Sequence, residues 1–410
     1  MKFNHRLGLL LLAVVFAAEV ALAQNAEAIA KLKRTVEQAF PVLLTPGLSV
    51  AVAVDREVVW TGGFGFADLE NQKPAGSRTV YRYASISKPI AATAVMQLAE
   101  RRKVALDAPI QRYVPTFPKK PEGEITLRHL MTHTSGIRHY RGLEMLSNQR
   151  YETVEAALGI FKDDALEFVP GAKYQYSSYG YNILAAAVEA KSGQSFRNYL
   201  KRNVFRPAGM TAADLELLEE AVEERARQYV RRGDSFVVAP TVDLSCKWAG
   251  GGMAGTAEDL VRFCIALQQG KLLRAKTTAQ MYEPGVLADG TRTDYGLGWR
   301  LRKDKAERLW VGHSGGATGG TTYFLHQPEE RLAVALLANA QGVMGLEALA
   351  MRVGEILAMS NEQPLPGRGG RGSRSARTAP ITGYLSVESA PIEISLQILK
   401  QSFDARAPVD

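Results

Sequence analysis

A serine and a lysine three residues apart, Ser85 and Lys88, are the side chains in this 410-residue sequence best placed for nucleophilic chemistry. Pro89 follows them directly, and an apolar stretch continues to Arg101. Because proline is tolerated in a helix only within the first turn, we expect a helix that begins close to Ser85. Residues three apart in a helix face the same side. The spacing therefore predicts a serine nucleophile beside a lysine base.

The expected helix also supplies the electrostatic setting for this chemistry. Apolar surroundings lower the pKa of a lysine, so Lys88 can take the hydroxyl proton of Ser85. The positive end of the helix lies at the amide of Ser85, where it would stabilise a developing oxyanion. The spacing S-x-x-K alone is common by chance. Further segments must therefore support the prediction.

Two other motifs are weaker candidates for chemistry. Gly312 to Gly316 matches the nucleophile elbow G-x-S-x-G, but no acidic residue lies between Ser314 and the only later histidine, His326. The required order of serine, acid and histidine cannot be assembled. His129 and His133 have the spacing of a zinc pair, yet leucine stands where H-E-x-x-H enzymes carry glutamate. We therefore predict no metal and no organic cofactor.

Five segments occur in the order found in one large superfamily. They are Tyr83–Lys88, Ile125–Gly136, Pro170–Gly171 with Tyr176–Tyr181, Ala249–Gly252 and His313–Gly316. In these segments the sequence resembles the serine β-lactamase and penicillin-binding-protein superfamily, in its class C-like branch of β-lactamases, D-alanyl-D-alanine carboxypeptidases, esterases and D-aminopeptidases. Residues 136–140 and 247–252 look most like the mitochondrial serine β-lactamase-like branch of animals. The resemblance covers about residues 30–358.

The resemblance implies roles for individual residues. Ser85 would be the acylated nucleophile and Lys88 its base. Tyr176 would relay the proton to the leaving group and activate the deacylating water, either as a phenolate or through Lys88. The remaining implied positions bind the substrate or its oxyanion, with Gly316 as the second oxyanion amide: Ser178, His313, Ser314, Gly315 and Gly316.

Two departures from the superfamily pattern bear on the substrate. Ser178 replaces the asparagine of the Y-x-N element and so removes an amide that would both donate and accept. His313 stands where a K-T-G motif has a permanently charged lysine. Both changes weaken the expected capture of a substrate carboxylate. They favour ester or peptide substrates over β-lactams and D-Ala-D-Ala peptides.

The elements that would carry these residues come in a strand–helix–strand order. A helix is expected at residues 26–40, and a hairpin of strands 48–54 and 57–62 follows. The middle of the chain is mostly helical, strands return at 309–313, 321–326 and 332–337, and a helix at 344–359 closes the pattern. We predict an α+β fold of the β-lactamase/transpeptidase type, in which an antiparallel sheet built from both ends of the chain is flanked by helices. Within the domain of residues 24–360, the sheet would come from 24–88 and 290–360, and an inserted, mostly helical domain from 89–289.

Both ends of the chain have distinct compositions. Lys2 and Arg6 precede an apolar run to Ala18, and the Ala21-Leu22-Ala23 site then predicts a cleaved signal peptide over residues 1–23. An uncleaved anchor remains an alternative, although the run is shorter than the roughly 20 residues that span a bilayer. Residues 361–410 begin with an Arg/Gly-rich stretch and are predicted to be a flexible linker and tail. Export permits a bridge between the two cysteines, Cys246 and Cys264, but their spacing does not decide it.

Composition limits the remaining functional classes. With 46% apolar and 22% charged residues the chain is that of a folded protein, and 50 basic residues interspersed with 42 acidic ones do not make a nucleic-acid groove. We predict an exported serine hydrolase, periplasmic or secreted, that acts on a small-molecule or peptide substrate, with no nucleic-acid partner and no stable membrane span after signal cleavage. Two alternatives stay open: a cell-wall D-Ala-D-Ala carboxypeptidase or β-lactamase, and a non-catalytic or self-assembling scaffold. The oligomeric state is not predicted.

Overall fold

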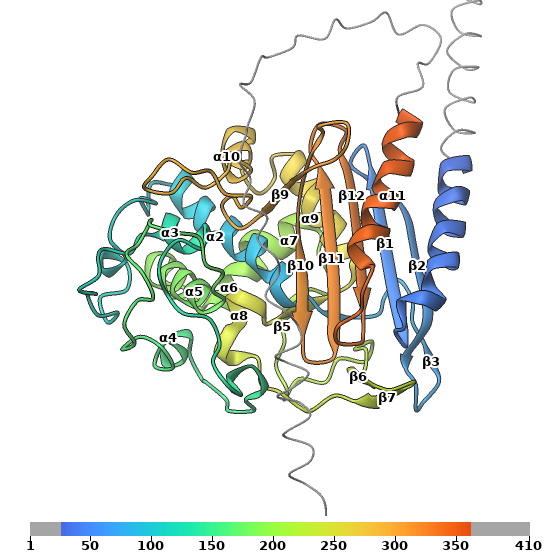
Figure 1. The fold of residues 1–410 in the computed structure, drawn as a ribbon, viewed down its shortest axis with the longest axis horizontal. Coiled ribbons are helices and arrows are strands. Elements are labelled where there is room, and N and C mark those ends of the chain that lie inside the picture. The colour runs from blue at the N-terminus through green and yellow to red at the C-terminus, as the bar shows by residue number, and fades with distance from the viewer. Residues whose placement is uncertain (1–25, 362–410) are drawn as a thin grey trace, which may run out of the picture.

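A seven-stranded antiparallel sheet forms the centre of the computed structural model, which describes residues 26–361. In spatial order its strands are β3 (Lys73–Pro74), β2 (Glu57–Asp68), β1 (Gly47–Val54), β12 (Leu332–Ala338), β11 (Gly320–Gln327), β10 (Leu309–Ala317) and β9 (Arg300–Lys303). The first and last long strands lie side by side in the middle, with Leu48 opposite Ala338 (Figure 1). The predicted sheet built from both ends of the chain is therefore confirmed.

The hairpin between β1 and β2 turns at the predicted pair of residues. Asp55 and Arg56 have φ angles of 49° and 73°, the left-handed pair that a two-residue turn of the primed type requires. The second strand is longer than predicted, because it continues past Gly62 to Asp68. A Cβ at Gly63 would come within 2.2 Å of the carbonyl oxygen of Ala75. Packing therefore requires glycine at residue 63 inside β2, and the glycines at this point do not mark the end of the strand.

Helices cover both faces of the sheet. On one face lie the helix of residues 26–43 and α11 (Leu346–Asn361), seen together on one side in Figure 1. Val50 and Val52 of β1 are buried in the cluster on that face. The alternate residues, Ala51 and Ala53, belong to the cluster on the other face, where α9 (Ala257–Gln268) packs against β1 and β12. Because successive side chains of a strand point to opposite faces, the valines of β1 pack against one layer of helices and the alanines, with smaller side chains, pack against the other.

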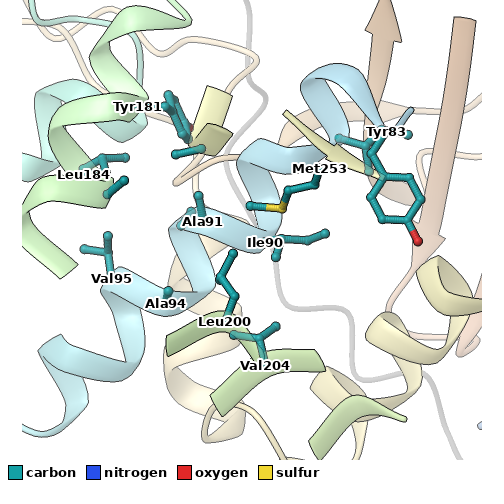
Figure 2. Packing of buried hydrophobic residues seen from close by; sticks show 14 of the residues in the cluster. Tyr83, Ile90, Ala91, Ala94, Val95, Tyr181, Leu184, Leu200, Val204 and Met253 are labelled. Atoms are coloured by element: carbon teal, nitrogen blue, oxygen red, sulfur yellow. The ribbon is translucent and has the colours of Figure 1, made fainter. Parts of the chain in front are cut away.

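The helix after Ser85, α2 (Ser87–Glu100), runs through the second core and is buried along almost its whole length. It contacts α5 (Tyr179–Ser192), α6 (Phe196–Leu200) and α8 (Trp248–Gly251). Figure 2 shows Ile90 and Val95 of α2 among side chains of neighbouring helices, including Leu184 and Leu200. A helix that is apolar on every side is stable only when enclosed in this way. It gives the residues at its start a rigid support.

The other elements are short. The remaining helices are α3 (Leu127–Met131), α4 (Val154–Leu158), α7 (Arg206–Ala208) and α10 (Ala275–Met281), and the 3-10 turns include η1 (Ala84–Ile86). The small strands are β4 (Tyr81–Arg82), β5 (Asp214–Leu215), β6 (Tyr229–Arg232), β7 (Ser235–Val238) and β8 (Met253–Gly255), in sheets of three and two strands. The middle of the chain is thus helical with small sheets between the helices.

Three further observations concern membrane-spanning helices, the two cysteines and the ends of the chain. Between residues 26 and 361 no helix is both long and apolar enough to cross a membrane. Cys246 and Cys264 are free and buried, so the structure contains no bridge between them. The predicted signal peptide and the tail from residue 362 onward lie outside the described residues.

Candidate active site

Ser85 lies in the turn that leads into α2. The 3-10 turn η1 holds it, and α2 begins two residues later with Pro89 as its third residue, as the sequence predicts. Ser85 is partly exposed while the residues on both sides of it are buried. Ala84 has a φ of 49°, an uncommon conformation for alanine. The local backbone thus presents one hydroxyl to the solvent from an otherwise closed surface.

Strands β10 and β11 hold this turn from the other side. Thr322 on β11 donates a hydrogen bond of 3.0 Å to the carbonyl of Tyr83. A Cβ at Gly315 would lie 2.5 Å from the same carbonyl oxygen and 3.0 Å from the Cβ of Ala84. Only glycine allows the strand to approach the Ser85 turn this closely.

The side chain of Lys88 is fully buried and reaches three oxygen atoms. Its Nζ lies 3.1 Å from Ser85 Oγ, 2.9 Å from Ser178 Oγ and 2.6 Å from the carbonyl oxygen of Gly250. Burial, helped by the charges of Arg300 and Lys247, holds the pKa of Lys88 well below its usual value. A neutral amine has two hydrogens and one lone pair. It can donate to Ser178 and Gly250 and keep the lone pair for the Ser85 proton.

Tyr176 lies next to both of these groups. The Nζ of Lys88 is 4.6 Å from the centroid of the Tyr176 ring, and the phenol shares hydrogen bonds with Ser85 and Ser178. Burial raises the pKa of Tyr176 to about 12. The side chain is therefore a neutral phenol near pH 7, which argues against the phenolate variant of its predicted role. A neutral phenol can still pass a proton between Ser85, Lys88 and a leaving group.

Two histidines that sequence analysis did not place in the site support the segment after Tyr176. The backbone N–H of Ser177 donates to Nδ1 of His133, and the next N–H, of Ser178, donates to Nδ1 of His139, both at 3.2 Å. Burial lowers the pKa of His133 well below its usual value and that of His139 to about 3, so both rings are neutral acceptors. Within residues 26–361 no group of three or more histidine, cysteine or acidic side chains could hold a metal ion.

His313 on β10 is buried and has both ring nitrogens engaged inside the protein. Its Nε2 lies 2.8 Å from the hydroxyl of Tyr295, and its Nδ1 contacts the carbonyl oxygen of Ser314. The carbonyl can only accept, so Nδ1 carries the hydrogen and Nε2 accepts from Tyr295. Burial lowers the pKa of His313 well below its usual value. It is thus a neutral group held by its neighbours, unlike the permanently charged lysine of a K-T-G motif.

The next residues of β10 form an open edge. β9 pairs with β10 only from Leu309 to Gly312, so in the described part of the chain residues 313–317 have a strand partner on one side only, β11. Ser314 is partly exposed and Gly316 is exposed, with open space where its side chain would be. An exposed edge of this kind offers backbone N–H groups to a substrate or an oxyanion.

A cation that sequence analysis missed lies at this site. The guanidinium of Arg300, the first residue of β9, is 5.8 Å from the centroid of the Tyr176 ring. Its Nε is buried without a hydrogen-bond partner among the described residues. Arg300 therefore brings a positive charge to the site, which the sequence-based interpretation of His313 did not take into account. No local motif indicates Arg300; pairing of β9 with β10 brings it there.

A partly exposed serine lies in contact with a buried lysine, whose pKa is lowered, and with a neutral tyrosine, and this arrangement is that of a serine hydrolase. The chain belongs to the beta-lactamase family, whose profile matches residues 36–358. The resemblance stated from the sequence is thereby confirmed.

Individual relatives agree with this assignment. The human serine beta-lactamase-like protein LACTB, mitochondrial, is 30% identical over 75% of this chain and 76% of its own length. Esterase EstB of Burkholderia gladioli is 28% identical, over 79% of this chain and 94% of its own. Among solved structures, the octameric penicillin-binding protein homologue from Pyrococcus abyssi superimposes with a TM-score of 0.70 at 25% identity, covering 81% of this chain and 77% of that one.

Proposed function

We propose that this protein is an exported hydrolase that cleaves ester or peptide and amide substrates through an acyl-enzyme on Ser85. One observation carries the proposal: the Oγ of Ser85 lies 3.1 Å from the Nζ of a fully buried lysine whose pKa is lowered. A serine hydroxyl is a weak nucleophile until a base of this kind takes its proton. The esterase among the relatives supports ester substrates.

The proposed reaction has two halves. In the first, the lone pair of Lys88 takes the proton of Ser85 while Oγ attacks the substrate carbonyl. The amides of Ser85 and Gly316 stabilise the oxyanion. The leaving group then departs with a proton that Tyr176 relays from Lys88. In the second half, the same groups remove a proton from water, which attacks the acyl carbon and frees Ser85.

Arg300 favours the cell-wall alternative as a second candidate. Its guanidinium would attract a substrate carboxylate, the group carried by penicillins and by D-Ala-D-Ala peptides. If it does so, Arg300→Gln should raise KM at least tenfold for an ester that carries a free carboxylate. The matching neutral ester should be unaffected. Equal effects on both esters would exclude this role.

Covalent labelling tests the proposal. Wild type and Ser85→Ala are incubated separately with a fluorophosphonate and with penicillin, and their intact masses are compared. We expect a fluorophosphonate adduct on wild type only. A penicillin adduct as well would move the assignment to the cell-wall alternative. The absence of any adduct would refute the hydrolase and favour a non-catalytic or self-assembling scaffold.

Export rests on residues 1–23 and is part of the proposal. A positively charged start, an apolar run and a small-residue cleavage site are the features of a secretory signal. Expression of the full chain in a bacterial host should give a periplasmic protein whose first residue is Gln24. An intact N-terminus in the membrane fraction would favour the uncleaved anchor.

A further inference from the structure

A cavity of about 530 Å³ lies away from Ser85, where the end of α5 and the start of α6 approach α8. Its volume is typical of a small-molecule site. Glu189 is one of its lining residues and lies about three helical turns beyond Ser178, a rise of roughly 16 Å along α5. None of the residues proposed for catalysis lines it. The cavity is therefore separate from the proposed active site.

Glu189 brings an unpaired carboxylate to this cavity. Its Oε1 accepts a hydrogen bond of 2.7 Å from the backbone N–H of Phe196, which also lines the cavity. Within residues 26–361 no basic side chain forms an ion pair with Glu189, and its second oxygen, Oε2, is neither hydrogen-bonded nor buried. One oxygen of the carboxylate is thus held by the protein, and the other is available to a ligand.

The negative charge of Glu189 is only partly compensated by the protein. Burial raises the pKa of Glu189 above its ordinary value, and the charge of Glu155 on α4 acts in the same direction. The hydrogen bond from the N–H of Phe196 offsets this in part. A cation at ion-pair distance favours the ionised form of a carboxyl group. A cationic ligand would therefore supply what the surrounding side chains do not.

The two basic side chains that line the cavity are already paired. Arg150 lies 2.9 Å from the carboxylate of Glu219, and Arg197 lies 2.6 Å from that of Asp214 and 2.5 Å from that of Glu220. Among the lining residues and their ion-pair partners, acidic side chains therefore outnumber basic ones. An anionic ligand would find no unpaired cation here, whereas a cationic ligand would find Glu189.

The apolar part of the lining indicates what kind of cation fits. Five lining residues from α4, α6, α8 and the β5 segment are apolar: Val154, Phe196, Leu215, Leu217 and Trp248. They offer a hydrocarbon surface beside the carboxylate. A divalent metal ion would need several oxygen ligands at one point, and no group of three histidine, cysteine or acidic side chains that could hold one occurs in residues 26–361. The lining thus suits an organic cation.

We propose that this cavity is a binding site for small organic monocations that carry a primary ammonium group on an apolar body. The ammonium group pairs with Oε2 of Glu189, and the apolar body packs against the five apolar side chains. The site does not depend on the function proposed for Ser85.

Saturation-transfer NMR on the full chain tests the site with three probes that share a phenylethyl body. They are 2-phenylethylamine, which is a cation near pH 7, the neutral 2-phenylethanol, and L-phenylalanine, which adds a carboxylate to the ammonium group. We expect a Kd on the order of millimolar for 2-phenylethylamine. The other two probes should bind at least tenfold more weakly, because one lacks the charge and the other brings a carboxylate into acidic surroundings.

Variants of the lining locate the bound probe. Glu189→Gln keeps the size of the side chain and an oxygen for the N–H of Phe196 but removes the charge, so it should weaken 2-phenylethylamine at least tenfold and leave 2-phenylethanol unchanged. Glu155→Gln is the matched control, since it removes a neighbouring carboxylate that does not line the cavity, and it should weaken binding less than threefold. Thr153→Lys adds a positive charge at an exposed lining residue and should weaken 2-phenylethylamine at least threefold.

Four results would overturn the site. They are no saturation transfer to 2-phenylethylamine, equal affinities for the amine and the alcohol, equal affinities for the amine and L-phenylalanine, and similar losses of amine affinity in Glu189→Gln and Glu155→Gln. Should Glu189→Gln fail to fold, an unchanged amine affinity in Thr153→Lys would reject the site instead. Failure of the proposed hydrolase function is distinguishable, because it would appear as the absence of a fluorophosphonate adduct on Ser85.

Discussion

Replacing Lys88 with methionine should abolish acylation while changing stability in a manner that depends on pH. The folded protein holds Lys88 with a pKa well below its usual value because the amine is buried, whereas an unfolded chain holds a lysine near pKa 10.4. As the pH falls below about 10, the unfolded state binds a proton that the folded state does not. Wild type therefore loses stability as the pH falls, with a limiting slope of about 1.4 kcal/mol per pH unit.

Lys88→Met removes this proton linkage. As the pH falls below the unfolded-state pKa, the variant should gain free energy of unfolding relative to wild type, with a slope that approaches about 1.4 kcal/mol per pH unit. The lost hydrogen bonds to Ser178 and Gly250 oppose this by about 0.5–1.5 kcal/mol each, but their cost does not vary with pH. The slope of the difference is thus a cleaner measure than its sign at any single pH.

Urea unfolding at several pH values measures the difference, and fluorophosphonate labelling measures acylation. Ser85→Ala is the control, since it removes the nucleophile without removing a titrating group and should give a difference that is flat with pH. A flat difference for Lys88→Met would mean that Lys88 stays protonated in the folded protein. The assignment of Lys88 as the base would then be refuted.

Further predictions concern groups around and behind the site. Tyr176→Phe should lower kcat/KM for p-nitrophenyl acetate by 10²–10⁴-fold, a typical contribution of proton transfer. The neighbouring Tyr174→Phe is the control and should change kcat/KM less than threefold. Similar losses of kcat/KM in both variants would reject the proton relay. His139→Ala should lower kcat about fivefold to tenfold, because the Ser178 amide loses its acceptor. His139→Asn offers an oxygen as acceptor and should restore most of the lost kcat. If steady-state kinetics show that His139→Asn has the same kcat as His139→Ala, a positioning role for His139 is excluded. Glu216→Gln should lower the free energy of unfolding by about 3–5 kcal/mol, because it strands the buried guanidinium of Arg82; urea unfolding that shows less than 1 kcal/mol would contradict this.

The parts of the fold that were predictable depend on local pattern. The alternating residues of β1, the turn at Asp55 and Arg56, and the apolar run of α2 are each specified within about a dozen residues. The approach of Lys88 to Ser85 follows from helical spacing alone. These features could be read from the sequence because short-range geometry determines them.

The parts that were missed depend on contacts between distant segments. Arg300 reaches Tyr176 only because β9 pairs with β10, and nothing in its neighbouring residues signals a binding role. His139 belongs to residues 136–140, which resemble a family segment, but the hydrogen bond that its ring accepts from the Ser178 amide joins residues 39 positions apart in the chain. The protonation state of Tyr176 also required the structure, since burial by the surrounding side chains sets its pKa. Sequence spacing carries no information about such enclosure.

The central position of β1 beside β12 has a consequence for how the protein is made. Leu48 cannot meet its partner Ala338 until the ribosome has synthesised nearly the whole domain. Closing a loop of that length costs about 5 kcal/mol in chain entropy before any sheet contact repays it. A nascent chain that has passed Ser85 therefore carries the nucleophile long before it has a β10 edge to place beside it. Hydrolytic activity should appear late and abruptly during synthesis, in a chain whose sheet is among the last parts to fold.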